Sequence, residues 1–173
     1  KSKSKLLEKF EKYDFSLWQK PINGHLSNIF IASKSVAKHM LKRKQGSIVN
    51  IASDVGIISP DHRIYEPNKK YIYKGVDFNT PISYSVAKSG IISLTRYLAT
   101  YWAQKGIRVN CISPAGVYKK HNKKFVEQLS QRIPLGRMAK SYELNGAIIY
   151  LCSNASSFVT GHNLVVDGGR TIW

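Results

Sequence analysis

The stretch GSIVNIASDVG at residues 46–56 decides the fold, because it joins an apolar strand to a polar end. Residues 47–52 form an apolar run of strand length, typical of a strand that is covered on both faces of a parallel sheet. Further strands are predicted at 107–112 and 164–166, with helical patterns between them. Strands that alternate with helices predict an α/β fold, a Rossmann-like doubly wound parallel sheet with helices on both faces.

The helices around this sheet are predicted from the spacing of apolar residues. Long helices are expected at 16–44 and 84–105, and shorter ones at 122–132 and 142–154. Ser16 and Gln19 form a possible capping box at the start of the first helix. Residues 54–83 are predicted to be a long loop, and the whole chain, 1–173, a single domain.

Three residues near this first strand suggest redox chemistry. Tyr84 and Lys88 share one face of a predicted helix, and Ser53 ends the strand. A nearby ammonium favours the phenolate, so Lys88 is expected to lower the pKa of Tyr84 from its usual value near ~10. Ser53 could hold a substrate oxygen while Tyr84 exchanges its proton, which is the acid–base half of an alcohol–carbonyl reaction. A nicotinamide cofactor would supply the hydride half.

Four stretches of the chain resemble the classical short-chain dehydrogenase/reductase family. They are GSIVNIAS at 46–53, YSVAKSGIISLTRYLA at 84–99, KGIRVNCISPAGV at 105–117 and VTGHNLVVDGG at 159–169. The resemblance implies an NAD(P)-dependent oxidoreductase in which Ser53, Tyr84 and Lys88 are catalytic and NAD or NADP is the cofactor. It also implies that Tyr84 and Lys88 contact the cofactor, with Lys88 bonded to the nicotinamide ribose.

The same resemblance implies roles for four further residues. Pro114, Gly116 and Val117 match the turn whose backbone contacts the nicotinamide carboxamide. His25 falls where the family has a catalytic asparagine that relays protons to the lysine. A neutral imidazole could serve the same relay, so His25 is a candidate catalytic residue. The alternative is that His25 is only a polar residue of the helix.

The chain resembles only the C-terminal two-thirds of a family member. It contains no Gly-rich turn that would receive the cofactor pyrophosphate at a helix N-terminus. We therefore expect the first strands of the family's sheet to be absent from this chain, which leaves strand 47–52 with an open edge. The isolated chain is expected to bind NADH and NADPH weakly or not at all.

The stretch 54–83 is longer than the corresponding part of small family members. It contains Tyr65 and Glu66, which are predicted to bind substrate, and long loops beside a site are often functional. Its aromatic and basic residues suit a sugar or nucleotide-sugar. This region also resembles members from surface-sugar and flagellin-modification pathways. A mobile lid without specificity is the alternative.

Two other functions remain open. One is a 3-oxoacyl carrier-protein reductase, which the basic surface favours and the insertion disfavours. The other is a non-catalytic truncated fragment that acts only in oligomerisation. The resemblance implies a homodimer or homotetramer formed through helices 16–44 and 84–105.

Composition limits the partners and the compartment. The net charge is +17, but the lysines gather at helix ends and in loops without a nucleic-acid-binding motif, so neither nucleic acid nor membrane is expected as a partner. No apolar run reaches the ~18 residues of a membrane span. Cys111 and Cys152 stand in apolar stretches and are predicted to be buried free thiols of a cytoplasmic protein. No metal-ligand motif is present.

Overall fold

A parallel sheet of three strands forms the centre of the protein. The computed structural model describes residues 9–65, 72–73, 76–77 and 79–173. The strands are β1 (Gly46–Ile51), β4 (Ile107–Pro114) and β5 (Asn163–Val166), in the order β1-β4-β5. Gly46 pairs with Ile107 at one end, and both pairings are parallel, as the sequence predicts.

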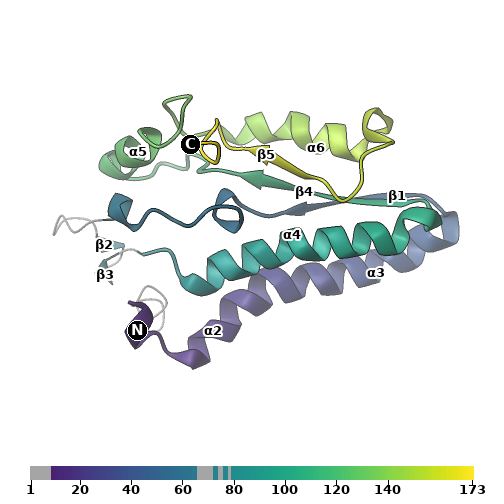
Figure 1. Cartoon of the computed structure of the whole chain (residues 1–173), viewed down its shortest axis with the longest axis horizontal. Coiled ribbons are helices and arrows are strands. Elements are labelled where there is room, and N and C mark those ends of the chain that lie inside the picture. Colours follow the sequence, from purple (N-terminus) through teal and green to yellow (C-terminus); the bar gives the residue numbers. More distant parts are fainter. Residues whose placement is uncertain (1–8, 66–71, 74–75, 78) are drawn as a thin grey trace.

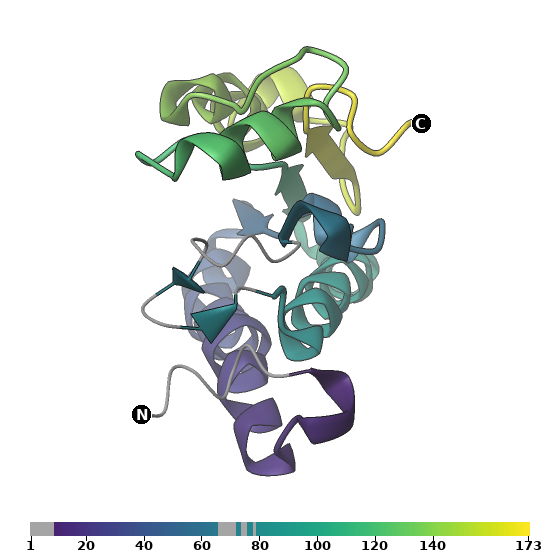
Figure 2. The same ribbon diagram turned by 90° about the vertical axis from the view of Figure 1, so that its left-hand side faces the viewer.

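Helices cover both faces of this sheet, as the sequence also predicts. The helices α3 (Asn28–Arg43) and α4 (Ile82–Trp102) lie on one face, and α6 (Asn145–Cys152) lies on the other (Figure 1). Figure 2 shows the same layers from one end, with α5 (Lys123–Ser130) on the side of α6. Two covered faces explain why the central strand β4 is buried along most of its length.

The core lies between β4 and the helices α3 and α4. Val109 and Ile91 are completely buried, and Trp102 is 7% exposed. Ala37 of α3 packs in the same cluster as Trp102 and Val109. The apolar spacing of α4 thus turns one stripe of the helix onto the sheet, which fixes where the residues at its N-terminal end lie.

The N-terminal helical segment is continuous but not uniform. It consists of α2 (Phe15–Ile22), a π-helical turn (Asn23–Ser27) and α3. Its N-cap is Asp14, whose carboxylate accepts the backbone N–H of Ser16 at 2.9 Å. The capping box predicted at Ser16 is therefore wrong, because the helix begins at Phe15 and Asp14 is its N-cap.

The region predicted as a long loop contains short elements. Two 3₁₀ turns occupy Asp54–Gly56 and His62–Tyr65, and β2 (Ile72–Tyr73) pairs antiparallel with β3 (Val76–Asp77). The prediction of an irregular loop over 54–83 is thus only partly right. The side chains of Glu66 and of the β2–β3 pair lie outside what the structure describes.

An ion-pair cluster anchors the first part of this region. The carboxylate of Asp61 accepts the Nε of Arg132 at 2.6 Å and the Nε of Arg63 at 2.9 Å. These two guanidinium groups hold the pKa of Asp61 well below its usual range. Because Arg132 follows α5, the cluster ties the loop to the opposite layer of the protein.

Gly106 has the tightest surroundings of the glycines in the described chain. Its φ is +76°, and a Cβ at this position would lie 2.0 Å from the carbonyl oxygen of Lys44. Gly106→Ala is expected to lower the free energy of unfolding by about 2 kcal/mol or more, from the left-handed backbone and the clash together. Urea denaturation followed by circular dichroism measures the loss.

Gly136→Ala is the matched control. Its φ is +69°, but a Cβ there would meet nothing within 4 Å. This variant reports the cost of the positive φ alone. Equal losses in the two variants would contradict a contribution from the contact with Lys44.

Two sequence predictions concern cysteines and membranes. Both cysteines are free, and Cys111 is buried as predicted, but Cys152 is exposed, which corrects the prediction for that residue. Cys152 is the last residue of α6, and the apolar stretch around it does not bury its thiol. No helix in the part of the chain that the structure describes has the length and apolar character to span a membrane.

Candidate active site

Ser53, Tyr84 and Lys88 meet at the carboxyl edge of the parallel sheet. Ser53 follows the end of β1 and is 7% exposed. Tyr84 lies in the first turn of α4, and Lys88 lies one turn further on with 8% exposure. Because α4 packs along the sheet, its N-terminal turns face the loop that follows β1. Ligands of open α/β sheets bind at this edge.

The three residues lie close together. The Ser53 hydroxyl is near enough to the Tyr84 side chain to influence its ionisation. The Lys88 ammonium donates to the carbonyl oxygen of Ile51 at 2.8 Å and lies 5.6 Å from the centroid of the Tyr84 ring. Serine, tyrosine and lysine therefore form one cluster, with the ammonium held by the strand.

The pKa of Tyr84 is raised, whereas the sequence predicts that Lys88 lowers it. Burial is the main cause of the rise, and the negative charge of Asp54 adds to it. The nearby Ser53 hydroxyl lowers the pKa of Tyr84 without reversing the shift. Burial also lowers the pKa of Lys88. Tyr84 is consequently a protonated donor at neutral pH.

His25 contacts Tyr84 from the N-terminal helical segment. The two rings meet edge to face, with centroids 5.2 Å apart and an interplanar angle of 86°. Burial and the charge of Lys88 lower the pKa of His25, so its imidazole is neutral at pH 7. The π-helical turn Asn23–Ser27 carries His25, and such turns often occur at functional sites. The side-chain oxygen of Asn23 accepts the hydroxyl of Ser27 at 3.2 Å. Among the described residues, no side-chain bond joins Asn23 to Ser53, Tyr84 or Lys88.

Sequence reasoning missed a buried ion pair behind this cluster. Asp54 is 3% exposed, Arg170 is 7% exposed, and their side chains are paired. Oδ1 of Asp54 accepts the Ser53 hydroxyl at 2.8 Å. The two residues are 116 positions apart, and no pattern in the sequence links them.

A cavity of about 370 Å³ opens onto these residues. Its wall is formed by Ser53, Asp54, Val55, Pro60, Ile64, Tyr65, Thr80, Pro81, Tyr84, Ala115, Gly116, Val117, Phe125, Leu129 and Arg170. Tyr65 stacks on Phe125 with centroids 6.0 Å apart, and its hydroxyl bonds Thr80 at 2.9 Å. Tyr65 therefore lines the same cavity as Ser53 and Tyr84, whereas Glu66, its predicted companion, lies outside the described residues.

The turn after β4 forms part of the wall of the same cavity. Gly116 and Val117 line the cavity, and the backbone N–H of Val117 has no acceptor among the described residues. That N–H suits a carboxamide oxygen. Pro114 ends β4 opposite Val166 and is not part of the cavity wall. Gly116 is needed for packing, since a Cβ there would lie 2.5 Å from Leu129.

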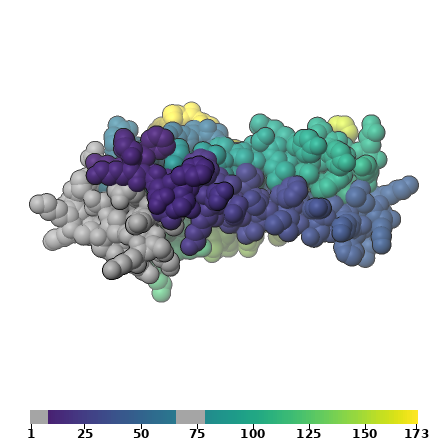
Figure 3. Space-filling view, turned by 90° about the horizontal axis from the view of Figure 1, so that it is seen from below, coloured from purple at the N-terminus to yellow at the C-terminus, as the bar shows by residue number. Residues whose placement is uncertain are grey.

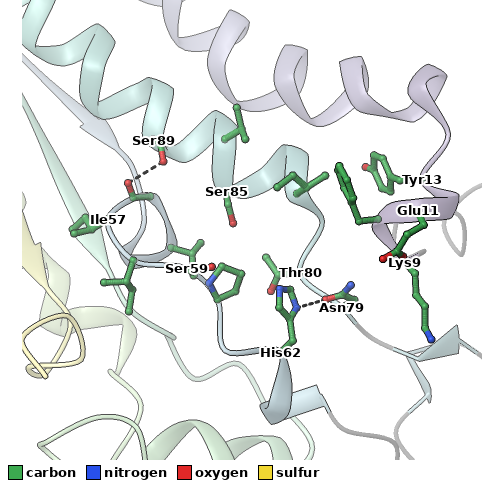
Figure 4. Close-up of a pocket in the computed structure, with 17 residues that line it drawn as sticks. Lys9, Glu11, Tyr13, Ile57, Ser59, His62, Asn79, Thr80, Ser85 and Ser89 are labelled. Carbon is green, nitrogen blue, oxygen red and sulfur yellow. Dashed lines mark hydrogen bonds between the residues drawn. The ribbon is translucent and has the colours of Figure 1, made fainter.

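A second cavity, of about 670 Å³, lies on the other side of the loop after β1 (Figure 4). It shares Val55, Pro60 and Thr80 with the first cavity. Figure 4 shows Ser85 among the residues that line it, and the Ser85 hydroxyl is buried without a partner in the described structure. The loop between the two cavities therefore presents Thr80 to both.

Two models of known protein families match this chain. The model described as short chain dehydrogenase matches residues 5–66, and the model described as Enoyl-(Acyl carrier protein) reductase matches residues 70–171. The parallel α/β fold with serine, tyrosine and lysine at its carboxyl edge already defines a class of nucleotide-dependent oxidoreductases. The chain belongs to the short-chain dehydrogenase family.

Individual relatives agree with this assignment. The chain is 34% identical over 168 residues to 2-dehydro-3-deoxy-D-gluconate 5-dehydrogenase of Bacillus subtilis, covering 94% of this chain and 59% of the relative. It is 33% identical over 159 residues to the 3-oxoacyl-acyl-carrier-protein reductase FabG of Thermotoga maritima, covering 90% and 57%. A short-chain dehydrogenase structure from Leptospira borgpetersenii with bound NAD+ superimposes with a TM-score of 0.85 at 35% identity, covering 96% and 61%. The chain thus spans about three-fifths of the length of these relatives.

Proposed function

We propose that the protein is an NAD(P)-dependent oxidoreductase that interconverts an alcohol and a carbonyl. The meeting of Ser53 and Tyr84 in the wall of one cavity, with the buried Lys88 beside Tyr84, carries this proposal. NAD+ is bound in the related structure from Leptospira borgpetersenii, and the free N–H of Val117 supports a nicotinamide site here. The cofactor, NAD or NADP, would supply the hydride chemistry.

Each residue of the cluster then has one task. In carbonyl reduction Tyr84 donates its proton to the substrate oxygen, and in alcohol oxidation its phenolate accepts that proton. Ser53 donates its hydroxyl hydrogen to Asp54 in this structure, and it would turn that hydrogen to the same oxygen when a carbonyl substrate binds. Lys88 uses one N–H for the carbonyl oxygen of Ile51, which leaves two for the nicotinamide ribose. His25, neutral and in contact with Tyr84, relays protons between the site and solvent.

The proposed substrate is a sugar or a related polyol. One relative is named as a dehydrogenase of a sugar acid. Tyr65 adds an aromatic wall to the cavity, and aromatic faces pack well on sugar rings. A nucleotide-sugar of surface-glycan or flagellin modification is the more specific form of this proposal, and the loop 54–83 would provide its contacts.

A 3-oxoacyl carrier-protein reductase is the second candidate. A relative of that name is 33% identical, and the net charge of +17 suits an acidic carrier protein. The two candidates differ in the substrate that must enter the cavity: a compact polyol, or a thioester at the end of a long arm.

A coenzyme-linked assay tests both candidates. Purified protein is incubated with NAD+ or NADP+ and a panel of sugars, sugar acids and nucleotide-sugars, and with NADH or NADPH and a 3-oxoacyl thioester. We expect reduced coenzyme to accumulate with a sugar or polyol. Turnover of the thioester alone would favour the second candidate. No turnover with any substrate, and no coenzyme binding by titration, would favour a fragment that acts only in oligomerisation.

The proposed oligomer uses the face formed by the two long helical segments. Figure 3 shows α3 and α4 side by side on this face. Phe30 and Ile31 of α3 are 53% and 58% exposed, and Tyr97 and Tyr101 of α4 are 64% and 57% exposed. Large apolar side chains gathered on one face favour contact with a second copy. Sedimentation velocity of Tyr97→Lys against the parent protein tests this homodimer or homotetramer.

A further inference from the structure

The site cavity is walled largely by two segments that are distant in the sequence. The loop after β1 contributes Ile64 and Tyr65, and the segment from the turn after β4 into α5 contributes Phe125 and Leu129. The 3₁₀ turn His62–Tyr65 packs against α5. On that side, the cavity therefore reaches no further than the contact between these two segments.

The two segments meet through an aromatic pair in the cavity wall. The rings of Tyr65 and Phe125 are stacked, with centroids 6.0 Å apart and an interplanar angle of 17°. This separation is within the range of aromatic rings in contact, so no substrate group fits between the two rings. The pair therefore closes the cavity on the side that it lines.

The ring of Tyr65 is held from both of its ends. Its hydroxyl is hydrogen-bonded to the hydroxyl of Thr80 at 2.9 Å, and Thr80 belongs to the same cavity wall. At the backbone end, the neighbouring Ile64 is buried in one apolar cluster with Leu129 and Met138. The position of Tyr65 in the wall is therefore fixed by packing and by a hydrogen bond.

An ion pair outside the cavity joins the same two segments. Asp61 of the loop pairs with Arg132, which follows α5, and neither residue lines the cavity. The guanidinium of Arg132 also donates to the carbonyl oxygen and the side-chain oxygen of Gln128 in α5, at 2.8 and 3.1 Å. Both charged side chains are about three-quarters shielded from solvent. The aromatic pair is therefore supported from behind by contacts that a substrate does not touch.

We propose that Tyr65 and Phe125 together set the length of the substrate that the site accepts. This inference rests on the proposed function and narrows its substrate to a compact molecule, such as a sugar or polyol with a short carbon chain. Ser53 and Tyr84 line the same cavity, so a substrate whose oxygen they hold has room only as far as the two rings. A longer chain enters only if the rings separate, which breaks the stack and displaces Tyr65 from Thr80.

The test removes one ring at a time and measures the accepted substrate length. Parent protein, Phe125→Ala and Tyr65→Ala are assayed for coenzyme-linked reduction of unbranched methyl ketones from butanone to 2-decanone. In the parent, kcat/KM is expected to fall steeply once the chain reaches the rings. In both variants the long ketones gain relative to butanone, by about fourfold for each methylene that enters the opened space. Circular dichroism verifies the fold of each variant, and either variant alone is sufficient for the test.

Two control variants accompany the ring deletions. Phe158 is fully exposed and lies outside the cavity wall, so Phe158→Ala is expected to keep the length profile of the parent. Tyr65→Phe loses the bond to Thr80 but retains the stacked ring, and it is also expected to keep the parent's length limit. An equal gain for long ketones in Phe158→Ala overturns the inference, as does a parent protein that reduces long and short ketones equally well.

A second readout does not depend on turnover. Binding of the same ketones to the parent and to the ring variants is followed by saturation-transfer NMR. Binding of longer ketones by the variants than by the parent supports the inference even if no ketone is reduced, an outcome that counts only against the proposed function. The same binding profile in the parent and in the folded ring variants, including no binding at all, overturns the inference whatever the activity.

Discussion

Tyr84→Phe is expected to lower turnover by about 10²–10⁴-fold, the range in which a positioned acid–base group contributes, and to leave coenzyme affinity unchanged. The substitution removes only the phenol oxygen. The ring remains to pack edge to face on His25 and beneath the Lys88 ammonium, so the fold should be retained. Steady-state kinetics and a fluorescence titration with reduced coenzyme measure the two effects separately.

Tyr65→Phe is the matched control for this loss. Tyr65 also lines the cavity, but its hydroxyl is bonded to Thr80. Its removal should affect substrate affinity more than turnover. If Tyr84→Phe retains turnover within tenfold of the parent, Tyr84 is not the proton donor and the proposed mechanism fails.

The second large effect is expected for Lys88→Met, which should weaken coenzyme binding as well as turnover. Hydrogen bonds from a charged donor contribute about 1.5–3 kcal/mol each, so loss of the contact with the ribose should raise the dissociation constant by at least about tenfold. Methionine fills a similar volume in the buried site. The carbonyl oxygen of Ile51 loses its donor, which costs about 1–3 kcal/mol of stability if it stays unpaired.

Lys105→Met separates these effects from a general loss of positive charge. The Lys105 ammonium lies 4.7 Å from the centroid of the Tyr101 ring, on the exposed end of the same helical segment. Its removal should leave coenzyme affinity and turnover near the parent values. Unchanged coenzyme affinity in Lys88→Met would show that Lys88 acts only through the structure of the strand end.

The layers of the fold were predictable because their signals are local. The apolar run at 47–52 is typical of a strand that is buried on both faces. The apolar stripe along α4 is typical of a helix that is buried on one face. Both patterns are visible in the sequence itself. The observed ends of the elements differ from the predicted ones by a few residues. β4 extends to Pro114, and α4 begins at Ile82. The short elements between Ser53 and Tyr84 were not predicted, since their stability comes from contacts such as Asp61 with Arg132.

The candidate site was predictable only in part. Tyr84 and Lys88 are one turn apart on a helix, and Ser53 ends the neighbouring strand, so their meeting follows from the fold. The direction of the pKa shift of Tyr84 did not follow, because burial and the charge of Asp54 depend on tertiary packing. The partner of Asp54 is 116 positions away, and a single sequence carries no signal for so distant a contact.

The buried pair of Asp54 and Arg170 has a consequence for how the protein folds as it is synthesised. Arg170 emerges from the ribosome long after Asp54, so the nascent chain carries an uncompensated carboxylate after β1. A carboxylate without its partner is stable only in contact with water, so the region around Asp54 stays open until Arg170 has been made. Closure of the candidate site is thus coupled to the arrival of β5 and the residues that follow it.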